Sequence, residues 1–292
     1  MKKLLLLTIL LAVILPISSA TKRALLIGIS EYPSYNEAKD ASWSNIHGAN
    51  DVSLLKTTLK NKGFIISTLT NSQATASRIR KAFSKLQGEA KPGDIIYLHF
   101  SGHGQPFEDL NGDEEDGWDE SIIPYDAQKV YKKGKYTGQN HITDDELNGY
   151  LRTIRKKVGS NGFVYVVIDA CHAGSSYRGE EDEDSVIIRG TDKGFSMTNK
   201  QYTPRIDKRG KIKVEKSPSL SNICIIEACR SYQVNSEIRI NGKYYGPLSY
   251  YVNQVLQTTK LDKNISWTNR VINLMNQDTR LVRQHPVIET SL

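Results

Sequence analysis

Cysteine is scarce in this sequence, and its few thiols cannot form a structural disulfide framework. The 292 residues contain three cysteines, so at least one is unpaired. Cys224 and Cys229 lie on one expected strand, and the extended chain between them spans roughly 16 Å, too far for a disulfide. Cys171 is therefore predicted to be a free thiol. In an exported protein such a thiol indicates chemistry or an intermolecular bond.

The chain also lacks the run of roughly 20 apolar residues that a membrane helix needs. Its first apolar run, Leu4 to Leu15, follows two lysines and precedes Pro16 and small residues up to Ala20. This pattern is typical of a cleaved secretory signal at residues 1–20, with an uncleaved anchor as the alternative. We therefore expect a periplasmic or secreted protein without stable membrane insertion once the signal is removed.

Neither sign of charge dominates. The 39 Lys and Arg residues against 32 Asp and Glu residues give a formal net charge of +7, which falls to +5 without the two signal lysines. An acidic stretch at 108–120 and a basic stretch at 193–216 interrupt an even mixture. Nucleic acid is therefore not an expected partner. The basic stretch is expected to be a solvated linker.

Apolar runs with strand character alternate with helical patterns, which favours an α/β fold with a mostly parallel sheet covered on both faces. In the expected helix at 143–154, Thr143 and Glu146 form a capping box. Residues 178–219 show no clear periodicity, which is typical of a functional loop or a disordered linker. The expected strands lie at 23–29, 64–69, 95–100, 163–168, 222–228 and 286–289, and the other expected helices at 50–61, 76–86, 247–256 and 267–275.

Two reactive side chains follow expected strands. Cys171 follows the strand at 163–168, and His103 follows the strand at 95–100. If these strands are parallel neighbours, the imidazole can accept the proton of the thiol and later protonate a departing amine. Nearby glycines allow the backbone N–H groups of Gly104 and Cys171 to form an oxyanion hole. The alternative is a buried cysteine and a loop histidine without chemistry.

Two further histidines compete for these roles. His172 is a rival base, but adjacent residues leaving a strand point in opposite directions, so its ring is expected to face away. His99 lies within a strand and is expected to be packed. A zinc site of His103, Cys171 and His172 would make the chain a metal-dependent hydrolase, although these spacings match none of the usual metal motifs.

Several motifs, taken in order, resemble the caspase-like (caspase-hemoglobinase) fold, and most closely the metacaspases and bacterial orthocaspases. The resemblance implies a three-layer α/β/α sandwich around a mostly parallel six-stranded sheet, as one domain over residues 21–292. That domain comprises a large-subunit-like part (21–177), the linker (178–219) and a small-subunit-like part (220–292). The motifs are RALLIGI at 23–29, GAND at 48–51, HFSGHG at 99–104, DGWDE at 116–120, DACHAG at 169–174, IIEAC at 225–229 and GPLSY at 246–250.

The resemblance implies a cysteine endopeptidase in which Cys171 forms a thioester acyl-enzyme and His103 is the general base. Asp51 and Asp169 fall where metacaspases hold the acids of their primary specificity pocket. Because carboxylates in a pocket favour a cationic side chain, we expect protein or peptide substrates cut after Arg or Lys. The alternative for Asp51 is a first-turn helix acid favoured by the macrodipole. The alternative for the chain is an inactive caspase-fold binding module.

The acidic stretch at 108–120 imitates the ligand spacing of a calcium-binding EF-hand, but Glu114 stands where that loop needs glycine. Resemblance to calcium-activated metacaspases implies a different calcium site, made of Asp119, Asp144 and Asp145. The last two are also explained as first-turn helix acids. Calcium would then be an activator, and the chemistry itself requires no cofactor.

The linker at 178–219 is rich in basic residues, which an enzyme that cuts after Arg or Lys could cleave in its own chain. A solvated loop that is never cut is the alternative. Resemblance to metacaspases also implies a monomer. The candidate cleavage positions are Arg178, Arg189, Lys193, Lys200, Arg205, Lys208, Arg209, Lys211 and Lys213.

Overall fold

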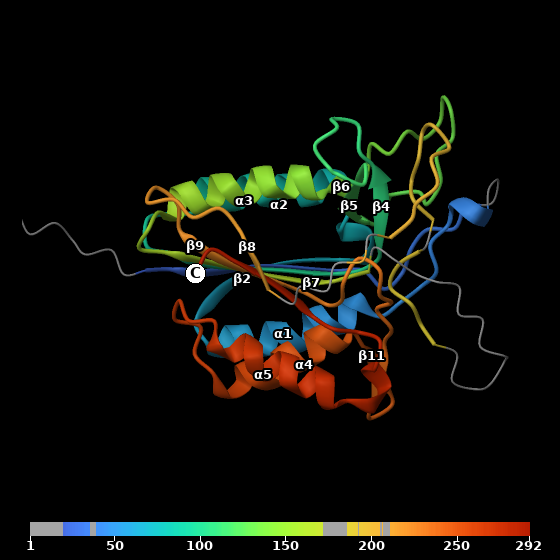
Figure 1. Ribbon diagram of the computed structural model, residues 1–292. Coiled ribbons are helices and arrows are strands. Elements are labelled where there is room, and N and C mark those ends of the chain that lie inside the picture. The colour runs from blue at the N-terminus through green and yellow to red at the C-terminus, as the bar shows by residue number, and fades with distance from the viewer. Residues whose placement is uncertain (1–19, 36–38, 172–185, 192, 205, 207–210) are drawn as a thin grey trace, which may run out of the picture.

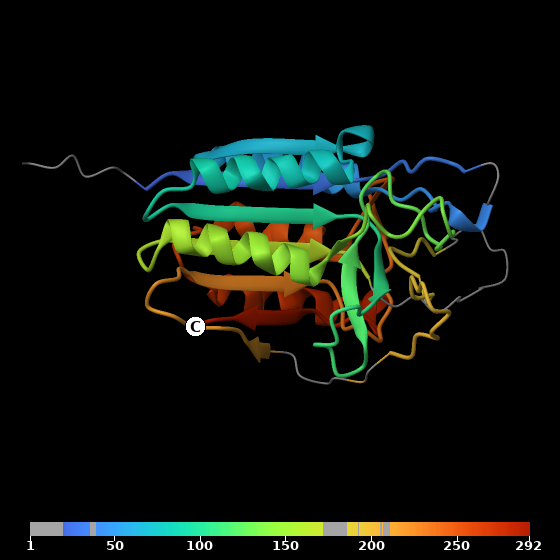
Figure 2. The ribbon, with the colours of Figure 1, turned by 90° about the horizontal axis from the view of Figure 1, so that it is seen from above.

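A seven-stranded sheet forms the centre of the computed structural model, which describes residues 20–35, 39–171, 186–191, 193–204, 206 and 211–292. The expected signal at 1–20 lies almost wholly outside these residues. Figure 2 shows the strands side by side, in the order β2, β1, β3, β7, β9, β12, β8. Their bounds are β1 Lys22–Gly28, β2 Phe64–Thr70, β3 Ile95–Ser101, β7 Phe163–Asp169, β8 Lys211–Lys213, β9 Asn222–Glu227 and β12 Val287–Thr290.

Six of these strands coincide with those expected from the sequence, but the expected total of six is wrong by one. The additional strand, β8, lies inside the stretch 178–219, which showed no pattern. It pairs in parallel with β12, which itself runs antiparallel to β9, and the remaining neighbours are parallel. A strand of three residues is too short to produce a visible alternation, so edge pairing with β12 defines it.

Helices cover both faces of the sheet, as expected (Figure 1). Helices α2 (Ala76–Glu89) and α3 (Asp144–Val158) lie on one face, and α1 (Gly48–Asn61), α4 (Pro247–Thr258) and α5 (Ser266–Gln277) on the other. Half of the expected capping box of α3 forms: the Thr143 side chain accepts a hydrogen bond from Glu146 N, while the Glu146 carboxylate pairs with Arg80 at 2.8 Å. Short 3-10 helices lie at Lys39–Ala41, Asn71–Gln73 and Thr279–Leu281. In the part of the chain described, no helix is long and apolar enough to cross a membrane.

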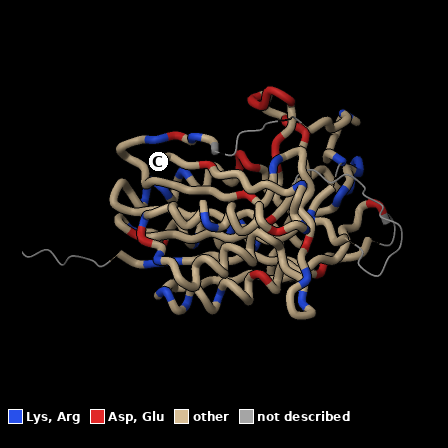
Figure 3. The backbone as a smooth tube through the Cα atoms, turned by 60° about the horizontal axis from the view of Figure 1, so that its bottom comes forward, with Lys and Arg blue, Asp and Glu red and all other residues tan. Residues whose placement is uncertain are grey.

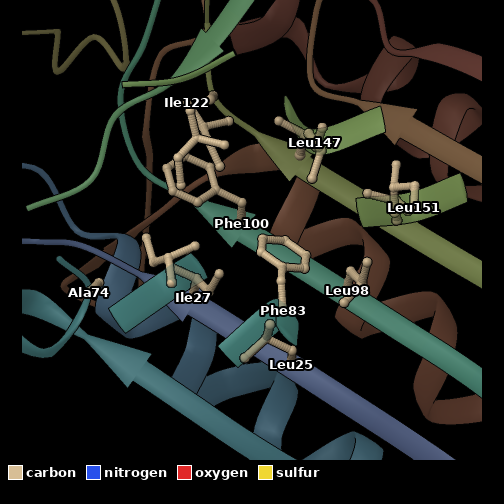
Figure 4. Packing of buried hydrophobic residues seen from close by; sticks show 14 of the residues in the cluster. Leu25, Ile27, Ala74, Phe83, Leu98, Phe100, Ile122, Leu147 and Leu151 are labelled. Carbon is tan, nitrogen blue, oxygen red and sulfur yellow. The ribbon is translucent and has the colours of Figure 1, made fainter. Parts of the chain in front are cut away.

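The two central strands, β3 and β7, are buried at all seven positions, which explains their nearly unbroken apolar sequences. Figure 4 shows Leu98 and Phe100 of β3 packed with Phe83 of α2 and Leu147 of α3. Each such buried side chain contributes about 1.5–3 kcal/mol to folding. The carboxyl ends of β3 and β7 are therefore held on a rigid base.

A small antiparallel sheet stands at this carboxyl edge. It comprises β4 (Gly104–Glu108), β5 (Trp118–Ile122) and β6 (Ile142–Thr143), and Ile122 anchors it in the main core (Figure 4). The chain thus runs from β3 through an acidic loop to the start of α3. A separate hairpin is formed by β10 (Ile238–Ile240) and β11 (Lys243–Tyr245).

The basic stretch at 193–216 is not the uniformly solvated linker expected from its charge. Phe195 is 1% exposed, and its ring stacks on Phe107 with 5.1 Å between centroids. Its backbone N–H donates to Pro106 O at 2.7 Å. One aromatic residue in a polar stretch gives no periodic signal, yet it fixes this part of the chain against β4.

Candidate active site

The pairing of β3 with β7 brings the two reactive residues to one edge of the sheet. These strands are parallel neighbours, and Ser101 lies opposite Asp169 in their register. Each strand therefore ends two residues before the side chain of interest, His103 or Cys171. The carboxyl ends of the two strands are therefore side by side, as expected from the sequence.

His103 is buried and held in one orientation. Its Nε2 lies 2.9 Å from the carbonyl oxygen of Ser44, and its ring stacks on Trp43 with 4.8 Å between centroids. A nitrogen facing a carbonyl must carry the proton, so Nδ1 carries the lone pair. Among the residues described, that Nδ1 has no hydrogen-bond partner. Burial lowers the pKa of His103 to about 3, so the neutral ring is available as a proton acceptor.

Cys171 is fully buried at the end of β7 and has a second thiol beside it. Its Sγ lies 2.8 Å from Gln233 O, and the Sγ of Cys229 lies 3.6 Å from the same oxygen. A hydrogen bond with Cys171, together with burial, raises the pKa of Cys229 well above its ordinary value. This contact could not be predicted from the sequence, because the two cysteines are brought together only by the neighbouring strands β7 and β9.

The two backbone N–H groups expected to form an oxyanion hole converge on one carbonyl oxygen. Cys171 N donates to Arg189 O at 2.9 Å, and Gly104 N donates to the same oxygen at 3.3 Å. A pair of fixed N–H donors beside a thiol is the arrangement that stabilises a carbonyl oxygen as it gains negative charge. The oxygen that these two N–H groups bind is the backbone carbonyl oxygen of Arg189, a residue of the same chain.

The side chain of Arg189 fills the pocket that contains Asp51 and Asp169. Its Nη2 lies 2.9 Å from Asp51 Oδ2, and its Nη1 lies 3.7 Å from Asp169 Oδ1. Glu237 Oε1 accepts from Nη2 at 2.8 Å and from Nε at 3.1 Å, and Ser101 Oγ accepts from Nη1 at 2.6 Å. Acceptors therefore surround all three nitrogens of the guanidinium, and the side chains of all three acids are fully buried.

Donors elsewhere in the fold hold the two aspartates in place. Asp169 accepts from the Asn235 side chain at 2.7 Å and from Ser249 N at 2.7 Å, while Gly246 N donates to Asp51 at 3.1 Å. The first-turn position of Asp51 in α1 is thus compatible with a role in the pocket. Asp51 is therefore both an acid in the first turn of α1 and a contact of Arg189 in the pocket, so the two readings do not exclude each other.

Burial and neighbouring charges shift the pKa values of the pocket residues in opposite directions. Burial raises the pKa of Asp51 to about 7; Arg189 opposes this shift and Asp169 adds to it. Burial would lower the pKa of Arg189, but Asp51, Asp169 and Glu237 raise it above its ordinary value. Arg189 is therefore a permanent cation in this pocket.

A second acidic cluster comprises Asp109 and Asp113 on the loop between β4 and β5, Asp119 in β5 and Asp144 at the start of α3. Side-chain oxygens of Asp109, Asp113 and Asp119 lie within 4.8 Å of one another. Figure 3 shows a run of acidic residues on a loop that stands out from the body of the domain. Oδ1 of Asp119 and Oδ1 of Asp144 are buried, and neither has a hydrogen-bond partner within the described chain. Of the expected calcium ligands, Asp145 instead accepts from Asn111 Nδ2 at 2.7 Å.

The surroundings of this acidic cluster suit a hard cation. Asp119 and Asp144 line a pocket of about 250 Å³ together with Glu120 and Glu227. Burial and neighbouring carboxylates raise the pKa of Asp119 to about 7 and that of Asp144 to about 8. Carboxylate oxygens without donors are the ligands that calcium prefers. The residues present therefore fit such an ion.

The fold and the sequence define a caspase domain. The model of the caspase-domain family Peptidase_C14 matches residues 21–292, and the chain belongs to that family.

Its relatives include metacaspases from fungi. It is 34% identical over 168 residues to Metacaspase-1B of Aspergillus fumigatus, and the matched region covers 53% of this chain and 36% of that protein. It is 27% identical over 273 residues to Metacaspase-1 of Schizosaccharomyces pombe, with 80% and 60% covered. A crystal structure of a Geobacter sulfurreducens protein shares the fold, with a TM-score of 0.61, 19% identity and 93% of each chain covered. The chain thus matches 60% or less of the length of these metacaspases.

Proposed function

We propose that this protein is a cysteine endopeptidase that cuts peptide bonds after arginine and, more slowly, after lysine. One observation carries the proposal: a guanidinium occupies the acidic pocket while the carbonyl of the same residue meets the N–H groups of Cys171 and Gly104. These are the two contacts that a residue preceding a cleaved bond needs. Membership of the caspase-domain family and similarity to metacaspases support the same activity.

In the proposed reaction the Cys171 thiol gives its proton to His103 Nδ1, and the thiolate attacks the carbonyl carbon. The oxygen takes up negative charge facing the N–H groups of Cys171 and Gly104. The C–N bond then breaks, and the proton held by His103 passes to the departing amine. Water, deprotonated by the same nitrogen, hydrolyses the thioester and restores the thiol.

The pocket favours arginine over lysine as the residue before the cut. Asp51, Glu237 and Ser101 each accept from a different part of the guanidinium. A lysine ammonium offers its donors from one nitrogen and would leave at least one of these acceptors unsatisfied. Because such a group costs about 1–3 kcal/mol when buried, we expect a preference of about tenfold or more.

Turnover of fluorogenic peptides ending in Arg, Lys or a neutral residue tests this proposal. The purified chain should cleave the Arg peptide fastest, and iodoacetamide should stop the reaction whereas a zinc chelator should not. Cys171→Ala should reduce kcat by about 10⁴-fold or more. Cys224→Ala, which removes a buried thiol on β9, is the matched control and should retain activity. Absence of turnover under all conditions would favour the alternative, an inactive binding module.

We propose further that calcium binds the acidic cluster and activates the enzyme. Asp119 and Asp144 would hold the ion, since each has a buried oxygen without a hydrogen-bond partner among the described residues. Asp109 and Asp113 would add to the expected set of Asp119, Asp144 and Asp145, because their oxygens lie within 4.8 Å of one another and of that of Asp119. The loop that bears them connects β4, which begins at Gly104, to β5, so an ion there would hold the strands that border the active site.

A further inference from the structure

Glu237, one of the three acids of the pocket, has a second polar neighbour besides Arg189. Its Oε2 lies 2.5 Å from Nδ1 of His47, and its Oε1 accepts from the backbone N–H of the same histidine at 2.8 Å. A carboxylate can only accept a hydrogen bond, so Nδ1 of His47 carries a proton whether the ring is neutral or charged. Both oxygens of Glu237 are therefore held by one residue, which lies directly before α1.

The backbone and the ring of His47 are both fixed by the fold. The next residue, Gly48, lies so close to the end of β3 that a Cβ atom on it would be 2.3 Å from Ser101 O. The His47 ring stacks on Tyr244 of β11, with 5.0 Å between centroids. The start of α1 and strand β11 thus hold the imidazole against Glu237.

The contact between His47 and Glu237 differs from an ion pair on the protein surface. The Glu237 side chain is fully buried, whereas that of His47 is 36% exposed. Surface pairs contribute little because water and salt screen them, but a buried carboxylate depends on the donors that face it. His47 therefore connects the solvent with an acid that lies inside the pocket.

The position of Glu237 determines how the pocket binds a guanidinium. Its Oε1 accepts from Arg189 Nε at 3.1 Å and from Nη2 at 2.8 Å. A lysine side chain has a methylene group where arginine has Nε, so this contact separates the two cations. Glutamate has three rotatable side-chain bonds, and its carboxylate faces Nε only when its rotamer is fixed. The two hydrogen bonds from His47 fix it.

We propose that His47 is a positioning residue for arginine recognition, because it holds Glu237 with one oxygen facing the Nε–H of the arginine before the cut. The inference deepens the proposed endopeptidase function and rests on it. The effect of His47 passes through Glu237 and not through the reacting bond. It should therefore appear in substrate binding and in the choice between Arg and Lys.

Steady-state kinetics of His47→Ala on fluorogenic peptides ending in Arg, Lys or a neutral residue test the proposal. KM for the Arg peptide should rise about tenfold, because Glu237 loses the donor to Oε2 and its rotamer is no longer fixed. The change in kcat should stay below about threefold, since an interaction that is the same in the ground state and the transition state affects KM. The preference for Arg over Lys should fall about fivefold, and turnover of the neutral peptide should be unchanged.

Two further variants make the test specific. His47→Gln keeps a side-chain N–H that can donate to Glu237 and should restore most of the KM and of the preference for Arg. Ser53→Ala, also on α1, removes an exposed hydroxyl that donates to Ala49 O within the helix, and it should leave all kinetic constants unchanged. A general loss of stability in His47→Ala would lower the turnover of all three peptides alike, so it would not change the ratio of Arg to Lys turnover.

An unchanged ratio of Arg to Lys turnover in His47→Ala, or an equal loss for all three peptides, would overturn this inference and leave the endopeptidase function intact. Absence of turnover by the unmodified chain would instead reject the proposed function. The inference is then tested by binding on Arg189→Ala, which removes the chain's own guanidinium from the pocket. Calorimetry with the Arg and Lys peptides, with and without His47→Ala, should show the same loss of preference, and equal preference in the two proteins would overturn the inference.

Discussion

Two acidic clusters on this molecule both contain buried carboxylates, but those of one cluster are paired with a cation and those of the other have oxygens without a hydrogen-bond partner among the described residues. In the pocket, Asp51, Asp169 and Glu237 are fully buried and surround one guanidinium. Beside the loop between β4 and β5, Asp119 of β5 and Asp144 of α3 have buried oxygens with no hydrogen-bond partner in the described structure. The comparison teaches that buried carboxylates require a counter-charge, which the chain supplies itself in one place and would take from solution in the other.

The difference also affects what each cluster can recognise. Planar N–H donors satisfy the pocket from several directions, which suits an arginine side chain. The loop offers oxygen atoms close together, within 4.8 Å for Asp109, Asp113 and Asp119, which suits a compact ion. Charge alone would not separate these two roles. The geometry of the acceptors does.

Among changes to the two acidic clusters, the largest effect is expected from weakening the pocket. Asp169→Asn keeps the shape of the side chain but removes a charge beside the guanidinium, and losing one partner of a buried charge pair costs about 2–5 kcal/mol. We expect kcat/KM for the Arg peptide to fall by about 10²–10³-fold, measured by initial rates.

A structural acid provides the control for this change. Asp94 is 2% exposed and lies before β3, at the opposite end from the active site, where it accepts from Thr21 N and Arg23 Nε. Asp94→Asn should lower the Tm while leaving the ratio of Arg to neutral peptide turnover unchanged. Equal losses in both variants would mean that Asp169 acts on stability and not on recognition.

The pocket also shows how far the sequence could predict the site. Cys171, His103, Asp51 and Asp169 were found because each lies in a short motif near a strand or helix end. Glu237 was missed because it belongs to no such motif. It lies 48 residues from Arg189, which it contacts, and only the folded chain brings them together.

The same distinction holds for the fold. Apolar runs predicted the six main strands, and the signal is most continuous in β3 and β7, which are buried on both faces. Strand β8 was missed because three residues carry no periodicity. Arg189 was named only as one basic residue among several, because its charge and not its burial is visible in the sequence. Its position in the pocket depends on the pairing of Ile188 with Ser236.

An intermediate effect is expected from the acidic loop. Asp144→Asn removes the negative charge of a carboxylate whose buried Oδ1 has no partner among the described residues, and we expect it to weaken calcium binding by about tenfold or more, since affinity depends on the number of charged ligands. Isothermal titration calorimetry with calcium measures this directly. Asp40→Asn, an exposed acid in a 3-10 helix elsewhere, removes the same charge and should leave the affinity unchanged. Equal affinities in all three proteins would place the ion elsewhere or exclude it.

The smallest effect is a pH dependence of stability that arises in the loop. Burial and neighbouring carboxylates raise the pKa of Asp119 from an ordinary 3.8 to about 7. Between these values the folded chain holds a proton that the unfolded chain has released, so stability falls as the pH rises and the contribution is lost above about pH 7. Solvent around the loop reduces the effect to about 1–2 kcal/mol, or a few °C in Tm.

Thermal unfolding of calcium-free protein at pH 5.5 and pH 8 measures this dependence. The fall in Tm should be smaller in Asp119→Asn than in the unmodified chain, because the variant has no carboxylate to ionise at that position. Asp51, whose raised pKa acts in the same direction, is present in both proteins and cancels in the comparison. Calcium should raise the Tm of the unmodified chain more at pH 8 than at pH 5.5, since the ion competes with the proton for the same oxygens. Identical pH profiles of the two proteins would show that Asp119 ionises normally, and the loop would then resemble the pocket in having its charge already balanced.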